Sequence, residues 1–163
     1  MEYAQALQIA EKYLSELRPH CDRIEIAGSI RRKKPQVKDI ELVAIPKPYQ
    51  AAGLFVDGIA TVVNQWQKIK GELPCKYTQR ILPEGIALDL FFPVHSNFGL
   101  IYLLRTGSKD FNQNTILTRL KGNGYKMEGG NLWYAGRIIP TPEEADVFLR
   151  AGMAFVEPEN RNL

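Results

Sequence analysis

The chain has 163 residues, of which 45% are apolar, and a formal net charge of +3 at pH 7. A chain of this size buries a sizeable core, which excludes a disordered protein and a miniprotein built on disulfides or metals. No apolar run approaches the roughly 20 residues that span a bilayer, and no signal-peptide pattern opens the chain, so we expect an intracellular protein without a membrane partner. Cys21 and Cys75 lack metal-ligand spacing; we interpret them as reduced thiols, with one disulfide between them as the alternative.

Charge is distributed unevenly along the chain. Residues 31–38 carry five basic side chains and no acid, and residues 96–126 carry five basic side chains and one acid. The remainder has a net charge of −6. Two basic segments in an otherwise acidic chain favour a phosphate-rich ligand.

Apolar periodicity predicts the elements of the first half. Side chains at helical spacing from Tyr3 to Leu17 indicate a first helix, which Pro19 ends. The residues Pro83-Glu84-Gly85 are typical of a hairpin turn between two strands. The further elements expected here are strands over residues 23–27 and 40–45, a helix over residues 50–66, and strands over residues 75–82 and 86–92.

Glycines separate short helices and aromatic strands in the second half. The expected elements are a helix over residues 98–104 that ends at Gly107, a helix capped by Ser108 that runs to about Lys121, short strands within residues 125–139, and a final helix with Thr141 as its cap. This change of pattern predicts two units, residues 1–95 and residues 96–163.

The turn after the first predicted strand has the composition of a phosphate-binding site. Gly28 and Ser29 expose backbone N–H groups and a hydroxyl there. Arg32 adds a guanidinium, which binds phosphate oxygens in a bidentate manner.

Three acidic residues lie on the predicted strands that follow. Asp39 and Glu41 are two residues apart, so their side chains share one face of a strand. A solvated strand edge balanced by nearby Lys and Arg explains this pair equally well. Asp89 lies in an otherwise apolar strand, where an ionised carboxylate is costly unless it is paired or bound to a metal ion. If the two strands are neighbours, the three carboxylates suffice to hold two Mg²⁺ ions for in-line phosphoryl transfer.

A combined pattern runs along the chain. It consists of Gly28-Ser29-x-Arg31-Arg32, six residues, Asp39-x-Glu41, the distant Asp89, then Arg105-Thr106-Gly107-Ser108 with Asn112, and an ending from Thr141 to Arg161. This pattern resembles the DNA polymerase X family, the group that includes DNA polymerase beta. The resemblance covers residues 26–163.

The resemblance implies an α+β fold, with a nucleotidyltransferase palm, a mixed sheet flanked by helices, over residues 1–95 and a small α/β thumb subdomain over residues 96–163. It implies that Asp39, Glu41 and Asp89 are the catalytic, metal-binding carboxylates. The residues expected to bind the incoming nucleotide are Gly28, Ser29, Arg32, Lys38, Arg105, Gly107 and Asn112. The residues expected to bind DNA are Lys109, Arg119 and Lys121.

The chain departs from the family pattern at several positions. Glu41 stands where most members have Asp, and Ile116 stands where a basic residue meets the template strand. Ala87 and Phe91 take the places of arginines that flank the third acid. Leu104-Arg105 replaces an aromatic pair that packs on the nucleotide sugar, which leaves sugar selectivity open.

These features together predict a minimal DNA-directed DNA polymerase that adds nucleotides to a primer 3′-hydroxyl at short gaps, in repair-type synthesis. The expected cofactors are two Mg²⁺ ions, with Mn²⁺ as a substitute, and the expected partners are gapped or primed DNA, deoxynucleoside triphosphates and a DNA ligase or other repair protein. The sequence has no counterpart of the family's N-terminal DNA-binding domain, so we expect salt-sensitive DNA binding. We also expect a monomer that is cytoplasmic or associated with the nucleoid. Template-independent nucleotide transfer and a non-catalytic nucleic-acid-binding protein are the alternatives.

Overall fold

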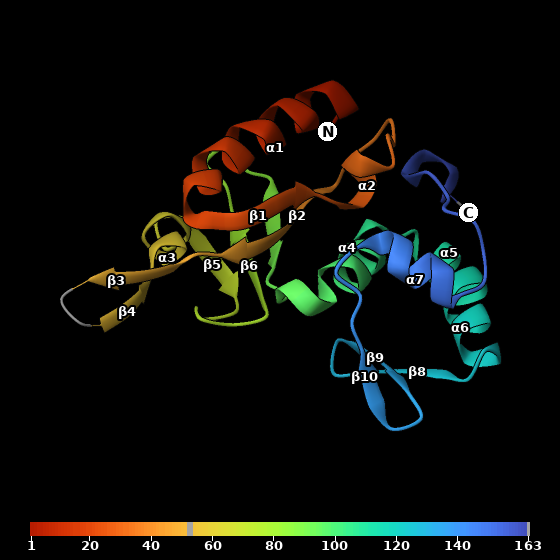
Figure 1. Cartoon of the computed structure of the whole chain (residues 1–163). Coiled ribbons are helices and arrows are strands. Elements are labelled where there is room, and N and C mark those ends of the chain that lie inside the picture. Colours follow the sequence, from red (N-terminus) through yellow and green to blue (C-terminus); the bar gives the residue numbers. More distant parts are fainter. Residues whose placement is uncertain (52–53, 163) are drawn as a thin grey trace.

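The computed structural model describes residues 1–51 and 54–162, without the side chains of residues 49–57. The chain is an α+β protein with a five-stranded mixed sheet in its N-terminal part and a smaller, mostly helical C-terminal part (Figure 1). The elements of the N-terminal part are α1 (Tyr3–Leu17), η1 (Arg18–His20), β1 (Cys21–Ile26), α2 (Gly28–Arg31), β2 (Asp39–Pro46), β3 (Pro48–Ala51), β4 (Leu54–Asp57), α3 (Gly58–Val63), β5 (Gln67–Lys70), β6 (Tyr77–Ile81) and β7 (Ala87–Phe91).

The C-terminal part begins with η2 and the helix α4. Its elements are η2 (His95–Asn97), α4 (Phe98–Thr106), α5 (Lys109–Phe111), the π-helical η3 (Asn112–Leu117), α6 (Thr118–Gly122), β8 (Tyr125–Glu128), β9 (Asn131–Tyr134), β10 (Arg137–Ile139), α7 (Glu144–Arg150) and η4 (Pro158–Asn160). The helices α5 to α6 form one continuous helical segment, and the Oγ atom of Ser108 caps it by accepting a hydrogen bond from the backbone N–H of Phe111. The strands β8, β9 and β10 form an antiparallel sheet in the order β10-β9-β8.

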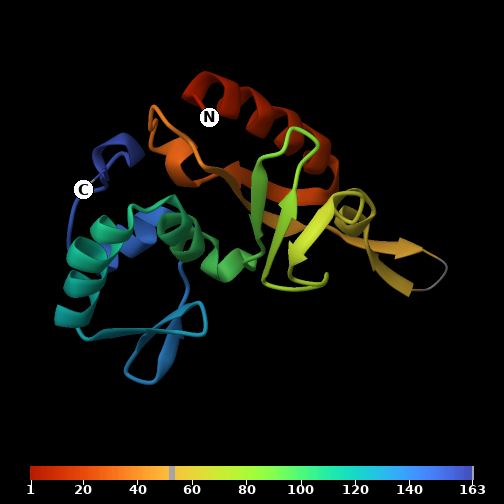
Figure 2. The ribbon, with the colours of Figure 1, turned by 180° about the vertical axis from the view of Figure 1, so that it is seen from behind.

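The large sheet has the strand order β1-β2-β7-β6-β5. β2 and β7 are parallel, and the other neighbouring strands are antiparallel. The helix α1 lies along one face of this sheet (Figures 1 and 2), where Ala10, Leu14 and Leu17 are buried with Ile40 and Leu42 of β2. Burial of this apolar face stabilises the N-terminal part.

β2 separates two chemically different faces of the sheet. Ile40 and Leu42 point into the core beneath α1. Because side chains alternate along a strand, Asp39 and Glu41 point to the opposite face. Further along β2, Val43 is buried on that opposite face in a cluster with side chains of α4. The carboxylates therefore lie next to the area that α4 covers.

The helix α4 contributes to two separate apolar cores. Phe98, Ile101 and Tyr102 pack on the face of the sheet opposite α1. Leu100 and Leu103 belong to the core of the C-terminal part. One helix thus connects the sheet to the C-terminal elements.

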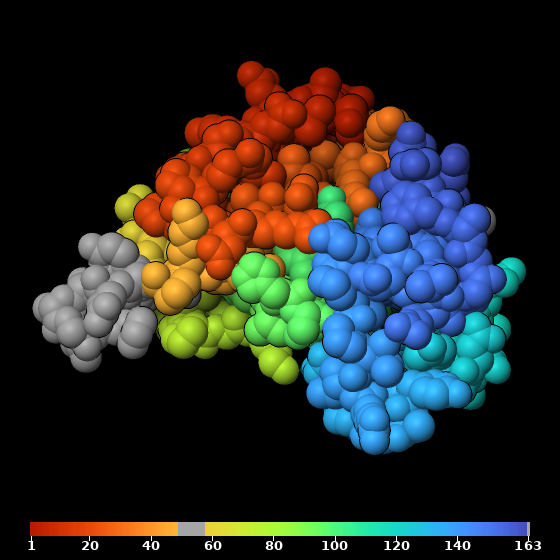
Figure 3. Space-filling model, viewed as in Figure 1, coloured from red at the N-terminus to blue at the C-terminus, as the bar shows by residue number. Residues whose placement is uncertain are grey.

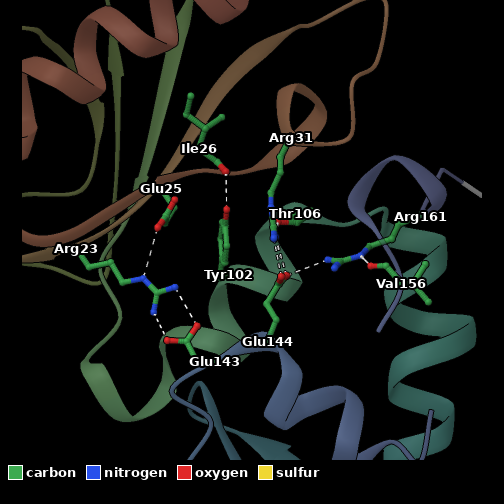
Figure 4. A network of polar contacts seen from close by, with 10 residues as sticks. All are labelled: Arg23, Glu25, Ile26, Arg31, Tyr102, Thr106, Glu143, Glu144, Val156 and Arg161. Atoms are coloured by element: carbon green, nitrogen blue, oxygen red, sulfur yellow. Dashed lines mark hydrogen bonds and ion pairs between the residues drawn. The ribbon is translucent and has the colours of Figure 1, made fainter. Parts of the chain in front are cut away.

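A network of polar contacts also joins the two parts (Figure 4). Arg23 of β1 donates to both carboxylate oxygens of the exposed Glu143, at 2.8 and 3.0 Å. Arg31 donates to both oxygens of the buried Glu144, at 2.7 and 2.6 Å, and the fully buried Arg161 donates to it at 2.9 Å. Burial alone would raise the pKa of Glu144, but the hydrogen bonds from Arg31 and Arg161 outweigh it and hold the pKa below its ordinary value. The C-terminal segment (blue) consequently packs against the N-terminal part (red and orange) in the space-filling view (Figure 3).

The structure confirms most of the expected elements and corrects others. The helix predicted over residues 50–66 is wrong in its first half, because β3 and β4 form a hairpin before α3; residues 52–53 of that prediction lie outside the described residues. Short apolar runs fit helix and strand alike, which explains this error. The strand β5 was not predicted, since all four of its residues are exposed. Thr141 is not the cap of the last helix: Glu143 takes that place, and Asp146 accepts a hydrogen bond from its backbone N–H.

Two further expectations concern the whole chain. Cys21 and Cys75, both within the described residues, form no disulfide with each other. Over residues 1–51 and 54–162, no helix has the length and apolar content to cross a bilayer.

Candidate active site

The structure brings the three acidic residues to one face of the sheet. β2 and β7 are neighbours, and Glu41 stands directly opposite Asp89 in their parallel register. Asp39 lies two residues before Glu41 and therefore on the same face. The strand that carries Asp89 is thus adjacent to the strand that carries Asp39 and Glu41, as the sequence analysis supposed.

The electrostatics of this face favour a positively charged ligand. Burial, followed by repulsion from Asp39 and Asp89, raises the pKa of Glu41 to about 7, although Arg32 and Arg105 oppose the shift. Burial and then repulsion from Asp89 also raise the pKa of Asp39 above its ordinary value. Burial is the largest cause of both shifts and repulsion between the carboxylates adds to it, so a bound cation would stabilise the ionised forms of these side chains.

The three carboxylates are not gathered into a single cluster. Among the described residues, no three His, Cys, Asp or Glu side chains lie close enough to hold a metal ion together. One oxygen of Asp89 accepts hydrogen bonds from Tyr77 and Gln79. The carboxylate of Glu41 extends instead towards Gly28, where it fills the space in which a Cβ would stand. The convergence that the sequence analysis expected is therefore absent as a preformed geometry in this part of the chain.

The donor set nevertheless suits a hard divalent cation. Carboxylate oxygens are the ligands that Mg²⁺ and Mn²⁺ prefer, and these three share one face of the sheet. The fit rests on donor type and charge rather than on a preformed coordination shell.

The turn that follows β1 presents groups suited to an anion. Gly28 has a φ of +62°, a conformation that glycine adopts without strain, and it opens the short helix α2. The Oγ atom of Ser29 is buried and has no hydrogen-bond partner among the described residues. Arg32 donates to the backbone oxygen of Thr106 and, at 2.9 Å, to Oδ1 of Asn162. A buried hydroxyl without a partner is a group that a bound ligand would satisfy.

A cavity of about 430 Å³ lies between this turn and the helices α4 to η3. It is lined by Arg32, Glu41, Leu104, Arg105, Gly107, Lys109, Asn112, Gln113 and Leu117. Asn112 donates from Nδ2 to the backbone oxygen of Leu104 at 2.8 Å, while its Oδ1 atom is buried and has no partner among the described residues. The cavity thus combines cationic side chains, one acid and an unsatisfied amide oxygen.

Several predicted site residues lie outside the lining of this cavity. Arg119 is exposed on α6, and Lys121 lines a different cavity with Leu120 and Tyr125. The other predicted residues outside the lining are Gly28, Ser29, Lys38, Asp39 and Asp89. Lys38 is exposed immediately before β2.

Residues on both sides of the site were not predicted from the sequence. Gln113 and Leu117 line the cavity, and Tyr77 and Gln79 hold Asp89. Tyr77 and Gln79 are two residues apart on a strand, so the sequence predicts that their side chains share one face of it. Their contact with Asp89 depends on the pairing register of β6 and β7, which the alternation of side chains along β6 alone does not give.

An acidic sheet face beside a partly basic cavity marks a candidate site for a phosphate-bearing ligand. Residues 101–162 match the sequence profile of the DNA polymerase beta thumb. This match includes the cavity residues Arg105, Gly107 and Asn112 and confirms the family resemblance for the C-terminal region. A comparison with curated proteins found no match.

Proposed function

We propose that this protein is a nucleotidyltransferase that works as a DNA-directed DNA polymerase and adds deoxynucleotides to a primer 3′-hydroxyl at short gaps. The observation that carries the proposal is the position of the Glu41–Asp89 pair relative to the C-terminal region. Glu41 lines a cavity whose opposite wall belongs to the segment related to a polymerase beta thumb. A nucleotide in this cavity has the Glu41 carboxylate on one side and a thumb-like helical segment on the other.

Cationic and hydroxyl groups of the N-terminal part bind the triphosphate in this proposal. Ser29 contributes the buried hydroxyl without a partner, and Arg32 contributes a guanidinium at the cavity wall. Lys38 adds positive charge beside β2. Groups of this kind stabilise the charge that develops on the leaving pyrophosphate.

Residues of the C-terminal part bind the sugar and base. Gly107 has no side chain at the cavity wall, and Asn112 lines the same cavity with a buried Oδ1 atom that has no hydrogen-bond partner among the described residues. Arg105 lies over the Phe91 ring, with its Cζ atom 4.2 Å from the ring centre, and replaces a flat aromatic surface with a cation at this wall. Lys109, Arg119 and Lys121 are exposed and contact DNA phosphates.

Asp39, Glu41 and Asp89 are the residues that would hold two Mg²⁺ or Mn²⁺ ions, which supply Lewis-acid activation of the primer oxygen and neutralise triphosphate charge. In the transfer, the 3′-oxygen forms a bond to the α-phosphorus and the bond to the β-phosphate oxygen breaks. Pyrophosphate leaves, and the hydroxyl proton passes to Asp89.

Incorporation of a labelled nucleotide into a duplex with a one-nucleotide gap, in the presence of Mg²⁺ or Mn²⁺, tests the proposal. We expect extension by the native chain and none by Asp89→Ala. Asp22→Asn, at an exposed position on the edge strand β1, is the matched control and should extend normally. No extension by the native chain, or extension that Asp89→Ala leaves intact, rejects the proposal.

Template-independent transfer is the second candidate, and one observation favours it. Ile116 is fully buried in the core of the C-terminal part, so this position presents no cation to a template strand. Extension of a single-stranded primer at a rate equal to that of a gapped duplex would establish this activity instead. Binding of DNA without either reaction would indicate the non-catalytic alternative.

A further inference from the structure

Asp89 is held in place by two hydrogen bonds to the same oxygen. Tyr77 donates its hydroxyl to Oδ1 at 2.6 Å, and Gln79 donates from Nε2 to Oδ1 at 2.9 Å. Asp89 is only 8% exposed. Among the described residues, Oδ2 has no hydrogen-bond donor, so the two oxygens of this carboxylate are chemically distinct.

Strand pairing explains how both donors reach one atom. In the antiparallel register of β6 and β7, Gln79 stands opposite Asp89 and Tyr77 stands opposite Phe91. Gln79 therefore reaches Asp89 directly, and Tyr77 reaches it along the diagonal, a distance that a long aromatic side chain spans. Ala87 and Phe91, the neighbours of Asp89 on the same face of β7, carry no side-chain donor.

The Tyr77 ring is itself fixed by a stack of side chains from four elements. Its ring lies nearly parallel to that of Phe91, at 18° with 4.9 Å between the ring centres. Nζ of Lys70 lies 5.4 Å from the centre of the Tyr77 ring, and Arg105 lies over the Phe91 ring. Stacking and cation–π contacts of this kind set the plane of the tyrosine and hence the direction of its hydroxyl.

We propose that Tyr77 and Gln79 are positioning residues that occupy Oδ1 of Asp89 and thereby present Oδ2 as its reactive oxygen. This inference rests on the proposed function, in which Asp89 acts on the primer 3′-hydroxyl. Hydrogen bonds to a ligating carboxylate fix its orientation, and losing them typically costs about 10- to 100-fold in metal affinity or activity.

Tyr77→Phe is the direct test, because it keeps the ring and the stack and removes only the hydroxyl. We expect kcat on a gapped duplex to fall about tenfold or more, with KM for the nucleotide changed less than about twofold. Mn²⁺ binding, titrated by electron paramagnetic resonance without turnover, should weaken about tenfold. Gln79→Leu should change both quantities in the same direction.

Tyr102→Phe is the matched control, since it removes another half-buried tyrosine hydroxyl, one that donates to the backbone oxygen of Ile26 at 3.2 Å. It should leave kcat and Mn²⁺ binding unchanged. The unfolding midpoint of Tyr77→Phe should stay within about 4 °C of the native value. A kcat loss that merely follows a lower midpoint would overturn the inference in favour of a structural role.

The two proposals fail in different ways. If Asp89→Ala abolishes extension while Tyr77→Phe retains native kcat and native Mn²⁺ binding, the positioning role is wrong and the proposed function stands. If the native chain does not extend primers, the proposed function fails. Equal Mn²⁺ binding by the native chain and Tyr77→Phe would then reject the inference as well.

Discussion

Glu41 and Gly28 approach each other so closely that residue 28 has no room for a side chain. A Cβ at this position would overlap the Glu41 carboxylate, and the positive φ of Gly28 independently disfavours other residues. The turn after β1 and the acidic strand β2 are therefore coupled where Gly28 meets the Glu41 side chain.

Replacing Gly28 tests this coupling. Gly28→Ala should lower the free energy of unfolding by about 1–2 kcal/mol for the backbone conformation alone. It should also displace the Glu41 carboxylate and reduce nucleotide incorporation by about 100-fold. Urea unfolding and gap-filling assays measure the two effects.

Gly85→Ala is the matched control for that substitution. Gly85 has a φ of +83°, but a Cβ there would meet nothing within 4 Å. This variant should lose a similar free energy of unfolding and keep its activity. Equal activities for the two variants would show that contact with Glu41 is unimportant.

We expect the Glu41 carboxylate to lower the stability of the fold and to be required for activity. Its carboxylate is largely buried and repelled by Asp39 and Asp89. Glu41→Gln removes that charge at nearly constant size. With a chelator present at about pH 8, the free energy of unfolding should therefore rise by about 2 kcal/mol. With Mg²⁺ present, nucleotide incorporation should be lost. Glu16→Gln, at an exposed position on α1, should change neither quantity. A less stable Glu41→Gln variant would contradict this account.

The adjacent glutamates at the start of α7 should differ sharply in their contribution to stability. Glu144→Gln leaves the fully buried Arg161 without its carboxylate partner and should cost about 3–5 kcal/mol. Glu143→Gln breaks an exposed ion pair with Arg23 and should cost about 0–1 kcal/mol. Denaturant titration of both variants checks the contrast, and similar losses would refute it.

The contribution of Glu144 should also depend on pH in a defined direction. Its pKa in the folded protein lies below its ordinary value of 4.5. The unfolded chain therefore takes up the proton first, so this stabilisation is complete above that ordinary value and is lost as the pH falls through the folded pKa. The difference in unfolding free energy between the native chain and Glu144→Gln should shrink as the pH is lowered. A constant difference across this range would exclude the charge as its cause.

Basic residues of the C-terminal helices should control the salt dependence of DNA binding. Lys121→Gln should weaken binding similarly for all DNA sequences and reduce the slope of log K against log salt by about 1 between about 50 and 200 mM. Lys12→Gln is the control, because Lys12 lies on α1 and pairs with Glu84. Fluorescence anisotropy of a labelled gapped duplex measures both slopes, and equal slopes would place the DNA elsewhere.

The features that could be predicted from the sequence are those that depend on residues close together in the chain. The periodicity of α1, the two-residue spacing of Asp39 and Glu41 and the cap at Ser108 each depend on neighbouring residues. Glu41 and Asp89 lie on strands that are far apart in the chain. From the sequence, the meeting of these carboxylates could be predicted only on the condition that the two strands are neighbours. The contacts of Tyr77 with Asp89 likewise required the actual register.

The helix α4 has two apolar faces, and they determine whether the two parts of the chain can unfold separately. The match to the polymerase beta thumb begins at residue 101, inside α4 and after Phe98, which packs on the sheet. The matched segment therefore begins inside a helix whose first turn packs on the sheet. A fragment that starts at residue 101 would lack the first turn of this helix and the whole of the sheet on which that turn packs. We accordingly expect the intact chain to unfold in a single transition, with sheet and helical signals lost at the same denaturant concentration.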